Sequence, residues 1–111
     1  MLQIDSEQNI TITRGDTLTL KVDAYKDGKL YALEDDDTMR FALAIGYVGQ
    51  TGYELIYTKE IPHDTLTFEL TSEETQNLIY PQYNYDVELT YGDGTVDTFI
   101  SAKLNVSKEV E

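Results

Sequence analysis

A pair of alternating segments near the C-terminus places the strongest constraint on how this chain folds. Apolar or aromatic side chains alternate with polar ones along residues 83–91, and a Gly-Asp-Gly turn at 92–94 separates them from a second stretch at 95–106. Successive side chains of a β-strand point to opposite faces, so this period of two predicts a hairpin with one buried and one solvated face. The expected inner row of its first strand is Tyr83, Tyr85, Val87, Leu89 and Tyr91, and the expected outer row is Asn84, Asp86, Glu88 and Thr90.

The same period of two recurs upstream of the hairpin. It predicts strands at residues 9–13, 17–24, 39–45, 53–61 and 65–70, and a short extended segment at 30–33. Asp27-Gly28 suits a tight turn, and residues 46–52 contain three glycines, which predicts a mobile tip between two paired strands. Along 53–61 the alternation predicts that Tyr53, Leu55 and Tyr57 share one face of their strand.

The overall pattern favours an all-β fold with one helical interruption. Residues 71–79 carry a capping residue, Thr71 or Ser72, followed by acids that suit the positive end of a short helix. A tyrosine just beyond it, Tyr83 or Tyr85, is placed to tie down a corner between two sheets. We therefore predict an antiparallel Ig-like β-sandwich of about seven to eight strands, with one short helical turn near 71–79. We expect a single domain over residues 1–111, with loose termini at 1–8 and 107–111.

Composition excludes several classes of partner. The 111 residues include 21 acidic and 8 basic side chains, for a formal net charge of -13. Such a charge repels phosphate backbones and anionic membrane surfaces, and the sequence has no apolar run long enough to span a membrane. With no cysteine in the chain, disulfides and thiolate metal sites are also excluded. We expect neither nucleic acid nor membrane as a partner.

Residues suited to catalysis are sparse. His63 is the only histidine and lies in a turn sequence, Ile-Pro-His-Asp, so we interpret it as a solvent-exposed turn residue. The chain contains no nucleophile elbow, zinc-binding helix motif, phosphate loop or dinucleotide fingerprint. Paired carboxylates can hydrolyse glycosides, but nothing singles out one pair among 21 acids. We expect a protein that is not an enzyme and holds no cofactor.

An acidic run at residues 34–37 is the candidate metal site. Calcium takes six to eight oxygen ligands, and Asp35, Asp36 and Asp37 offer several in one loop. Asp93 or Asp97 could add oxygens if the fold brings them close. The competing interpretation is a solvated acidic loop, since consecutive residues of an extended loop point in different directions.

Tyrosines suggest a second kind of site. The chain has nine tyrosines and no tryptophan, and Tyr47, Tyr53 and Tyr57 flank the glycine-rich tip. Tyrosine is favoured at interfaces because it offers a large contact area with few rotatable bonds, and its ring can also stack on sugars. We predict that these three residues form an interaction surface, for a protein or for a carbohydrate.

Several motifs together resemble one family of phage proteins. Arg14-Gly15-Asp16 lies between two strands, a Tyr-x-Tyr-Asp-aliphatic strand begins at Tyr83, and Gly92-Asp93-Gly94 closes a hairpin. This arrangement, over about residues 10–106, resembles the Ig-like N-terminal domain family of baseplate upper proteins from phages of Gram-positive hosts. The segments that carry the resemblance are residues 10–20, 26–28, 41–43 and 83–89.

The resemblance implies a structural role. It suggests a non-enzymatic tail or baseplate protein of a phage or prophage, which contacts other virion proteins and forms homo-oligomers on assembly. Such a protein resides in the host cytoplasm before assembly and in the virion afterwards. The alternative is a carbohydrate- or calcium-dependent binding module that uses the three tyrosines and the acids at 35–37, and a small hydrolase ranks third.

Overall fold

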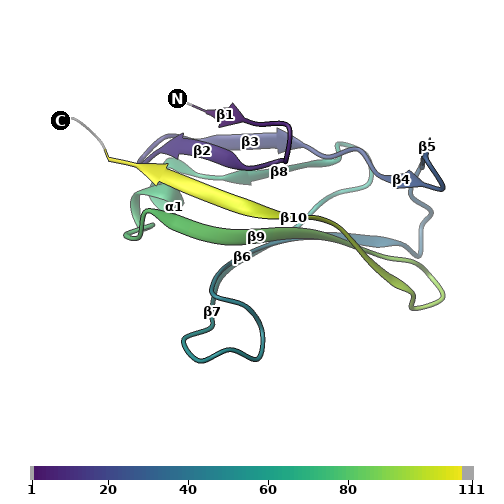
Figure 1. The fold of residues 1–111 in the computed structure, drawn as a ribbon. Coiled ribbons are helices and arrows are strands. Elements are labelled where there is room, and N and C mark those ends of the chain that lie inside the picture. The colour runs from purple at the N-terminus through teal and green to yellow at the C-terminus, as the bar shows by residue number, and fades with distance from the viewer. Residues whose placement is uncertain (1, 109–111) are drawn as a thin grey trace.

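A computed structural model describes residues 2–108 of the chain and confirms that it is mostly β, with 50% of residues in strands and 5% in a helix. The elements run β1 (Gln3–Ile4), β2 (Ile10–Thr13), β3 (Leu18–Lys21), β4 (Tyr25–Lys26), β5 (Lys29–Leu30), β6 (Thr38–Ile45), β7 (Glu54–Glu60), β8 (Thr67–Leu70), α1 (Ser72–Gln76), β9 (Gln82–Thr90) and β10 (Val96–Ser107) (Figure 1). The predicted hairpin at 83–106 and the predicted helical turn within 71–79 are both confirmed as β9–β10 and α1.

The strands in the described part of the chain form one large sheet and two small ones. The large sheet has the order β1-β2-β10-β9-β6-β7, while β3 pairs with β8 and β4 with β5. Among the strands of residues 2–108, all pairs are antiparallel except β2 and β10, which run parallel with Ile10 opposite Leu104. The expectation of a wholly antiparallel fold is therefore wrong, and the large sheet is mixed. Alternation in the sequence fixes which face a residue occupies but leaves strand pairing open, so the parallel contact could not be foreseen.

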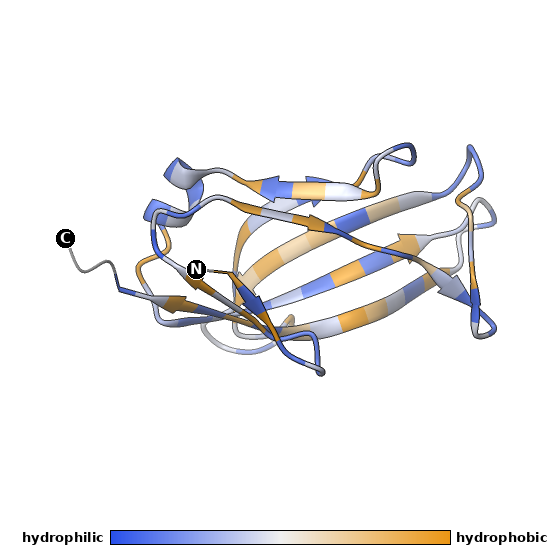
Figure 2. Ribbon diagram, turned by 90° about the horizontal axis from the view of Figure 1, so that it is seen from above, coloured by the Kyte–Doolittle hydropathy of each residue, from blue (hydrophilic) through white to orange (hydrophobic). Residues whose placement is uncertain are grey.

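The β3–β8 pair covers the inner face of the large sheet. The ring of Phe68 on β8 stacks on Phe41 of β6 with ring centroids 4.2 Å apart. Hydrophobic and hydrophilic positions alternate along the strands (Figure 2), as expected for elements with one buried face. The core is formed by Ile10, Ile12, Leu18, Val22, Ala24, Met39, Phe41, Leu43, Ile61, Phe68, Leu70, Leu78, Tyr83, Tyr85, Val87, Leu89, Leu104 and Val106.

Helix α1 closes one end of the molecule. Its start has a capping box, in which Thr71 Oγ1 accepts a hydrogen bond from the Glu74 backbone and the Glu74 carboxylate accepts one from the Thr71 backbone. Glu74 also forms an ion pair with Lys59 of β7, with a nitrogen–oxygen distance of 2.6 Å. These contacts tie the helix to the edge of the large sheet.

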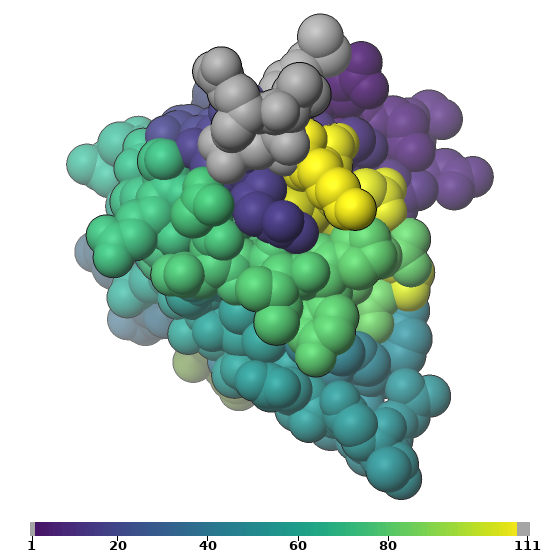
Figure 3. Space-filling model, turned by 90° about the vertical axis from the view of Figure 1, so that its left-hand side faces the viewer, coloured from purple at the N-terminus to yellow at the C-terminus, as the bar shows by residue number. Residues whose placement is uncertain are grey.

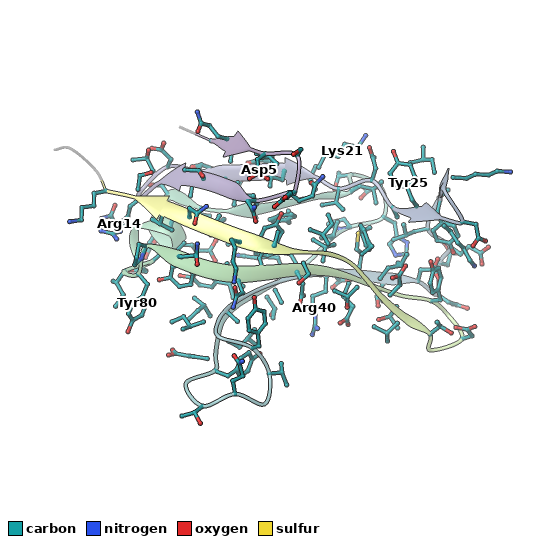
Figure 4. The ribbon with its side chains drawn as sticks, in the orientation of Figure 1. Asp5, Arg14, Lys21, Tyr25, Arg40 and Tyr80 are labelled. Carbon is teal, nitrogen blue, oxygen red and sulfur yellow. The ribbon has the colours of Figure 1, made fainter. Side chains whose placement is uncertain are left out.

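The turn at residues 14–16 packs against the same helix. Arg14 Nε donates to the carbonyl of Leu78 at 2.9 Å, and the Gly15 amide donates to Thr75 Oγ1 at 3.1 Å. Arg14 and Tyr80 accordingly lie together at one end of the molecule (Figure 4). The turn between β2 and β3 is therefore hydrogen-bonded to α1 and to the segment that follows it.

Tyr83 forms the corner contact for which the sequence offered two candidates. Its hydroxyl accepts a hydrogen bond from the Tyr80 amide at 3.0 Å, three residues upstream. The Tyr85 hydroxyl instead donates to the carbonyl of Gln8. Tyr83 fixes the chain between α1 and β9, and Tyr85 fixes the N-terminal turn.

Part of the N-terminal segment expected to be loose is attached to the sheet. Strand β1 pairs with β2, with Gln3 opposite Thr11. The carboxylate of Asp5 accepts hydrogen bonds from the amides of Glu7 and Asn9, both at 2.9 Å. At the other end, β10 extends to Ser107. Residue 1 and residues 109–111, which belong to the expected loose termini, lie outside the described residues.

Candidate functional site

A row of small side chains crosses the outer face of the large sheet, with a single carboxylate among them. The strand register places Ala42 of β6 and Ser101 of β10 directly opposite Asp86 of β9. Residues paired in this way point to the same face of a sheet. Because alanine and serine are short, the surface is depressed on both sides of Asp86.

Longer side chains form the next rows on either side. On one side Arg40 pairs with Glu88 at 3.4 Å, and Figure 4 shows Arg40 on the outer side of the sheet. On the other side Lys103 Nζ donates to Asn84 Oδ1 and to the Tyr47 hydroxyl, the latter at 2.8 Å. The two basic residues nearest the depression thus each have a partner of their own.

The loop at residues 46–53 projects from the same outer face (Figures 1 and 3). Several hydrogen bonds shape it. Asn84 Nδ2 donates to the Gly46 carbonyl at 2.8 Å, the Tyr47 amide donates to Gln50 Oε1 at 3.1 Å, and the Gln50 amide donates to the Tyr47 carbonyl at 3.0 Å. Large apolar side chains are exposed on this loop and on the adjoining start of β7, namely Tyr47 at 50%, Val48 at 83%, Tyr53 at 37% and Leu55 at 50%. The loop therefore presents apolar surface beside the row of small side chains.

Together the loop and the sheet enclose a groove of about 330 Å³, which we call the outer groove. Its floor is formed by Ala42, Ala44 and Asp86, and its apolar wall by Val48, Tyr53 and Leu55. The groove can accommodate one long side chain or a small ligand.

Asp86 is the chemically distinctive residue of the outer groove. Burial raises the pKa of its carboxyl, the negative charge of Glu88 raises it further, and Arg40 opposes both effects. Within residues 2–108 the carboxylate forms no hydrogen bond or ion pair, and no fully buried side-chain oxygen or nitrogen lacks a hydrogen-bond partner. The carboxylate of Asp86 is therefore open to solvent at the groove and available to a ligand.

The structure brings two of the three predicted tyrosines to this site and separates the third. Tyr47 and Tyr53 line the outer groove, whereas Tyr57 packs against the core and donates from its hydroxyl to the Glu74 carbonyl at 3.2 Å. The cause is a bulge in β7, where Leu43 pairs with Tyr57 but Ala44 pairs with Leu55. The predicted shared face of Leu55 and Tyr57 is therefore wrong.

The acidic loop lies elsewhere, and Asp37 in it has a structural role. Asp37 is only 3% exposed, and its Oδ2 accepts hydrogen bonds from the Tyr31 hydroxyl at 2.5 Å and the Glu34 amide at 2.9 Å. Its Oδ1 accepts from the Gly92 amide at 3.0 Å. The hydrogen bond from Tyr31, followed by those from the backbone, lowers the pKa of Asp37, while the same contact raises the pKa of Tyr31 to about 12.

The predicted metal ligands are not gathered by the fold. Asp35 and Asp36 are exposed on the loop, and Asp37 faces inward toward hydrogen-bond donors, which a cation would have to displace. Across the described residues, 2–108, no group of three or more histidine, cysteine or acidic side chains is placed to hold a metal ion. The structure thus does not assemble Asp35, Asp36 and Asp37 as a binding site.

His63 joins this loop cluster as well. It is exposed, as expected, and its Nε2 donates to the carbonyl of Asp37 at 2.5 Å. The turn after β7 is thereby linked to the acidic loop, and the contact places the only histidine of the chain in a structural role.

Comparison with known proteins adds no family assignment, since no family model and no curated protein matches the chain. The part of the chain that the structure describes also contains no helix of the length and apolar character needed to cross a membrane.

Sequence reasoning overlooked Asp86, Ala42 and Ser101 as site residues. The alternation did place Asp86 in an outer row, but outer acids are ordinary in a chain of this charge. What distinguishes Asp86 is the small size of its cross-strand neighbours, and that depends on a register that a single sequence does not specify.

Proposed function

We propose that the protein is a non-enzymatic structural component of a phage or prophage particle, associated with its tail or baseplate, and acts through protein–protein contacts. The main support is the outer groove with its projecting loop, where four large apolar side chains are exposed next to one another. Exposed apolar surface rimmed by polar residues is typical of interaction sites. The motifs that resemble those of baseplate upper proteins are the support for placing the protein in a phage particle.

We also propose that the fold is an Ig-like sandwich. In support, β3 and β8 pack over a sheet in which β10, β9, β6 and β7 are neighbours, and β2 runs parallel to the last strand. The hydrogen bond from the Tyr80 amide to the Tyr83 hydroxyl corresponds to the tyrosine corner of such folds.

A sheet edge offers a means of self-assembly. Strand β7 is the last strand on its side of the large sheet, and within residues 2–108 it pairs only with β6. Its outer backbone groups can pair with a second copy, as edge strands do when no neighbour covers them. This contact would build the homo-oligomer that we propose for the assembled particle, alongside contacts with other virion proteins.

Two variants test this function. Leu55→Ser and Val48→Ser each remove an exposed apolar side chain at the groove, while Leu30→Ser, at a residue 69% exposed on β5, is the matched control. We expect the first two to reduce co-purification with tail components and the third to leave it unchanged. A wild-type protein that stays monomeric in light scattering across a concentration series and is absent from purified particles would contradict the proposal.

A carbohydrate-binding module is the second candidate. The tyrosine rings at the outer groove lie close to Asn84 and Asp86, a combination of stacking and polar groups that suits a sugar. Specific binding on a glycan array, lost on Tyr53→Ala, would favour this function over the structural one. The calcium-dependent form has no support from the acidic loop, as described above.

A further inference from the structure

We propose that the outer groove receives a lysine or arginine side chain from a partner protein, with the cationic head at Asp86 and the aliphatic stem along Leu55 and Tyr53. This inference rests on the proposed function, because it names the partner chemistry of the same surface. The partner is a basic protein of another kind, and an extended segment of it would lie across the outer face.

The first argument is the unpaired carboxylate. Asp86 lies on the floor of the groove without a hydrogen bond or ion pair among residues 2–108, although two basic side chains are nearby. Arg40 pairs with Glu88, and Lys103 binds Asn84 and Tyr47. A partly desolvated carboxylate that its own protein leaves unpaired is stabilised most by an external cation with N–H donors.

The second argument is the shape of the groove. The short side chains of Ala42 and Ser101 leave space beside Asp86 for an ammonium or guanidinium group. The apolar wall suits the methylene stem that lysine and arginine place along hydrophobic surface. The loop already holds a cation against an aromatic ring, since Lys103 Nζ lies 5.0 Å from the Tyr47 ring centroid, and Tyr53 offers a second ring at the same site.

The third argument is charge. With a net charge of -13, the protein attracts basic partners over the range of the Debye length and repels a second copy of itself. Glu88, two residues along β9 from Asp86, adds negative charge on the same face of the sheet. A basic protein is therefore favoured over a second copy of this chain as the occupant of the outer groove.

Burial raises the pKa of Asp86, because the carboxylate is less well solvated in the groove than in water. An incoming lysine or arginine would lower that pKa and stabilise the carboxylate. A bound cation therefore stabilises the Asp86 carboxylate more than it would stabilise a fully hydrated carboxylate on the surface.

Amide chemical shifts of the full chain provide the test. The probes are the N-acetyl N-methylamides of lysine, arginine and norleucine, the last having no charged head. We expect lysine and arginine to shift the amides of residues 42, 86 and 101, with about tenfold tighter binding than norleucine, the difference expected for a charge-assisted hydrogen bond. Asp86→Asn should abolish this preference, and Asp97→Asn, at an exposed acid of β10, should retain it.

Three outcomes would overturn the inference. They are equal binding of lysine and norleucine, a cation preference that survives Asp86→Asn, and shifts of the same amides by a short oligosaccharide but not by lysine. The first two leave the proposed function standing, provided that Leu55→Ser still impairs co-purification with tail components. Binding of the oligosaccharide but not of lysine, together with normal co-purification of Leu55→Ser, would contradict both this inference and the proposed structural function. That result would favour the carbohydrate-binding module.

Discussion

Asp37 and Asp86 are two acids that differ in how the rest of the protein contacts their carboxylates. Asp37 immediately precedes β6, and Asp86 lies on β9, which pairs with β6. Asp37 is buried with three hydrogen-bond donors on its carboxylate, which lower its pKa. Asp86 is half-buried with no such donor, and burial raises its pKa. The difference teaches that an acid-rich sequence can contain both structural and binding carboxylates, and that only the surroundings of each tell them apart.

The largest loss of thermal stability is expected when Asp37, the acid with a structural role, is replaced. Asp37→Ala leaves the donors of Tyr31, Glu34 and Gly92 without their acceptor and separates three loops that it joins. We expect the melting temperature to fall by roughly 5–10 °C in thermal unfolding. Asp36→Ala, one residue away on the exposed side of the loop, is the control and should change it little. Equal effects of the two substitutions would contradict the structural role of Asp37.

Substitution of Gly92, whose amide donates to Asp37, should give the next largest loss of stability. A Cβ at Gly92 would lie 2.7 Å from the Cβ of Asp36, which is too close for two non-bonded carbon atoms. Gly92→Ala should therefore cost about 1 kcal/mol in the free energy of unfolding, at the low end for overpacking because Asp36 lies on an exposed loop, and denaturant titration would measure it.

A double-mutant cycle makes this prediction specific. Asp36→Gly removes the opposing Cβ, so the pair Gly92→Ala with Asp36→Gly should be more stable than the sum of the two single effects predicts. Strict additivity would show that the close contact is not the cause of the destabilisation.

Acid should weaken the loop cluster through Asp37. Its pKa in the folded protein lies below the ordinary value of 3.8, so the stabilisation is complete above that value and is lost as the pH falls through 3.8 toward the folded-state pKa. Melting curves between pH 6 and pH 2 should show a smaller loss of stability for Asp37→Ala than for the wild type. A steeper loss in the variant would contradict this assignment.

The smallest change in stability is expected for substitution of Asp86, which should stabilise the protein where substitution of Asp37 destabilises it. The folded-state pKa of Asp86 lies above 3.8, so its charge opposes folding at neutral pH and this cost disappears as the pH falls below 3.8. Asp86→Asn should raise the melting temperature by about 1–3 °C at pH 7, since solvent and Arg40 moderate the effect, and by less at pH 3. Destabilisation at pH 7 would mean that Asp86 has a structural partner after all.

Much of the fold could be predicted because it depends on local alternation. The inner row of β9 is buried at Tyr83, Tyr85, Val87 and Leu89 as expected, and the Asp27-Gly28 turn has positive φ angles of 53° and 77°. These features follow from neighbouring residues alone, so a single sequence contains them.

The candidate site could be predicted only in part, because it depends on pairing between distant strands. The glycine-rich tip of the loop indicates Tyr47 and Tyr53, which flank it. The bulge that turns Tyr57 toward the core, and the register that sets Asp86 between Ala42 and Ser101, are properties of the assembled sheet. The structural role of Asp37 cannot be predicted from the acidic run for the same reason, since its partners Tyr31 and Gly92 come from separate loops.

The most direct test of the contrast is an NMR titration of the side-chain carboxyl carbons, followed from pH 7 to pH 2 with and without the lysine amide probe. Without the probe, we predict a pKa above 3.8 for Asp86 and below 3.8 for Asp37. The probe should lower the pKa of Asp86 and leave that of Asp37 unchanged. An Asp86 pKa at or below that of Asp37, or one that does not respond to the probe, would contradict the account.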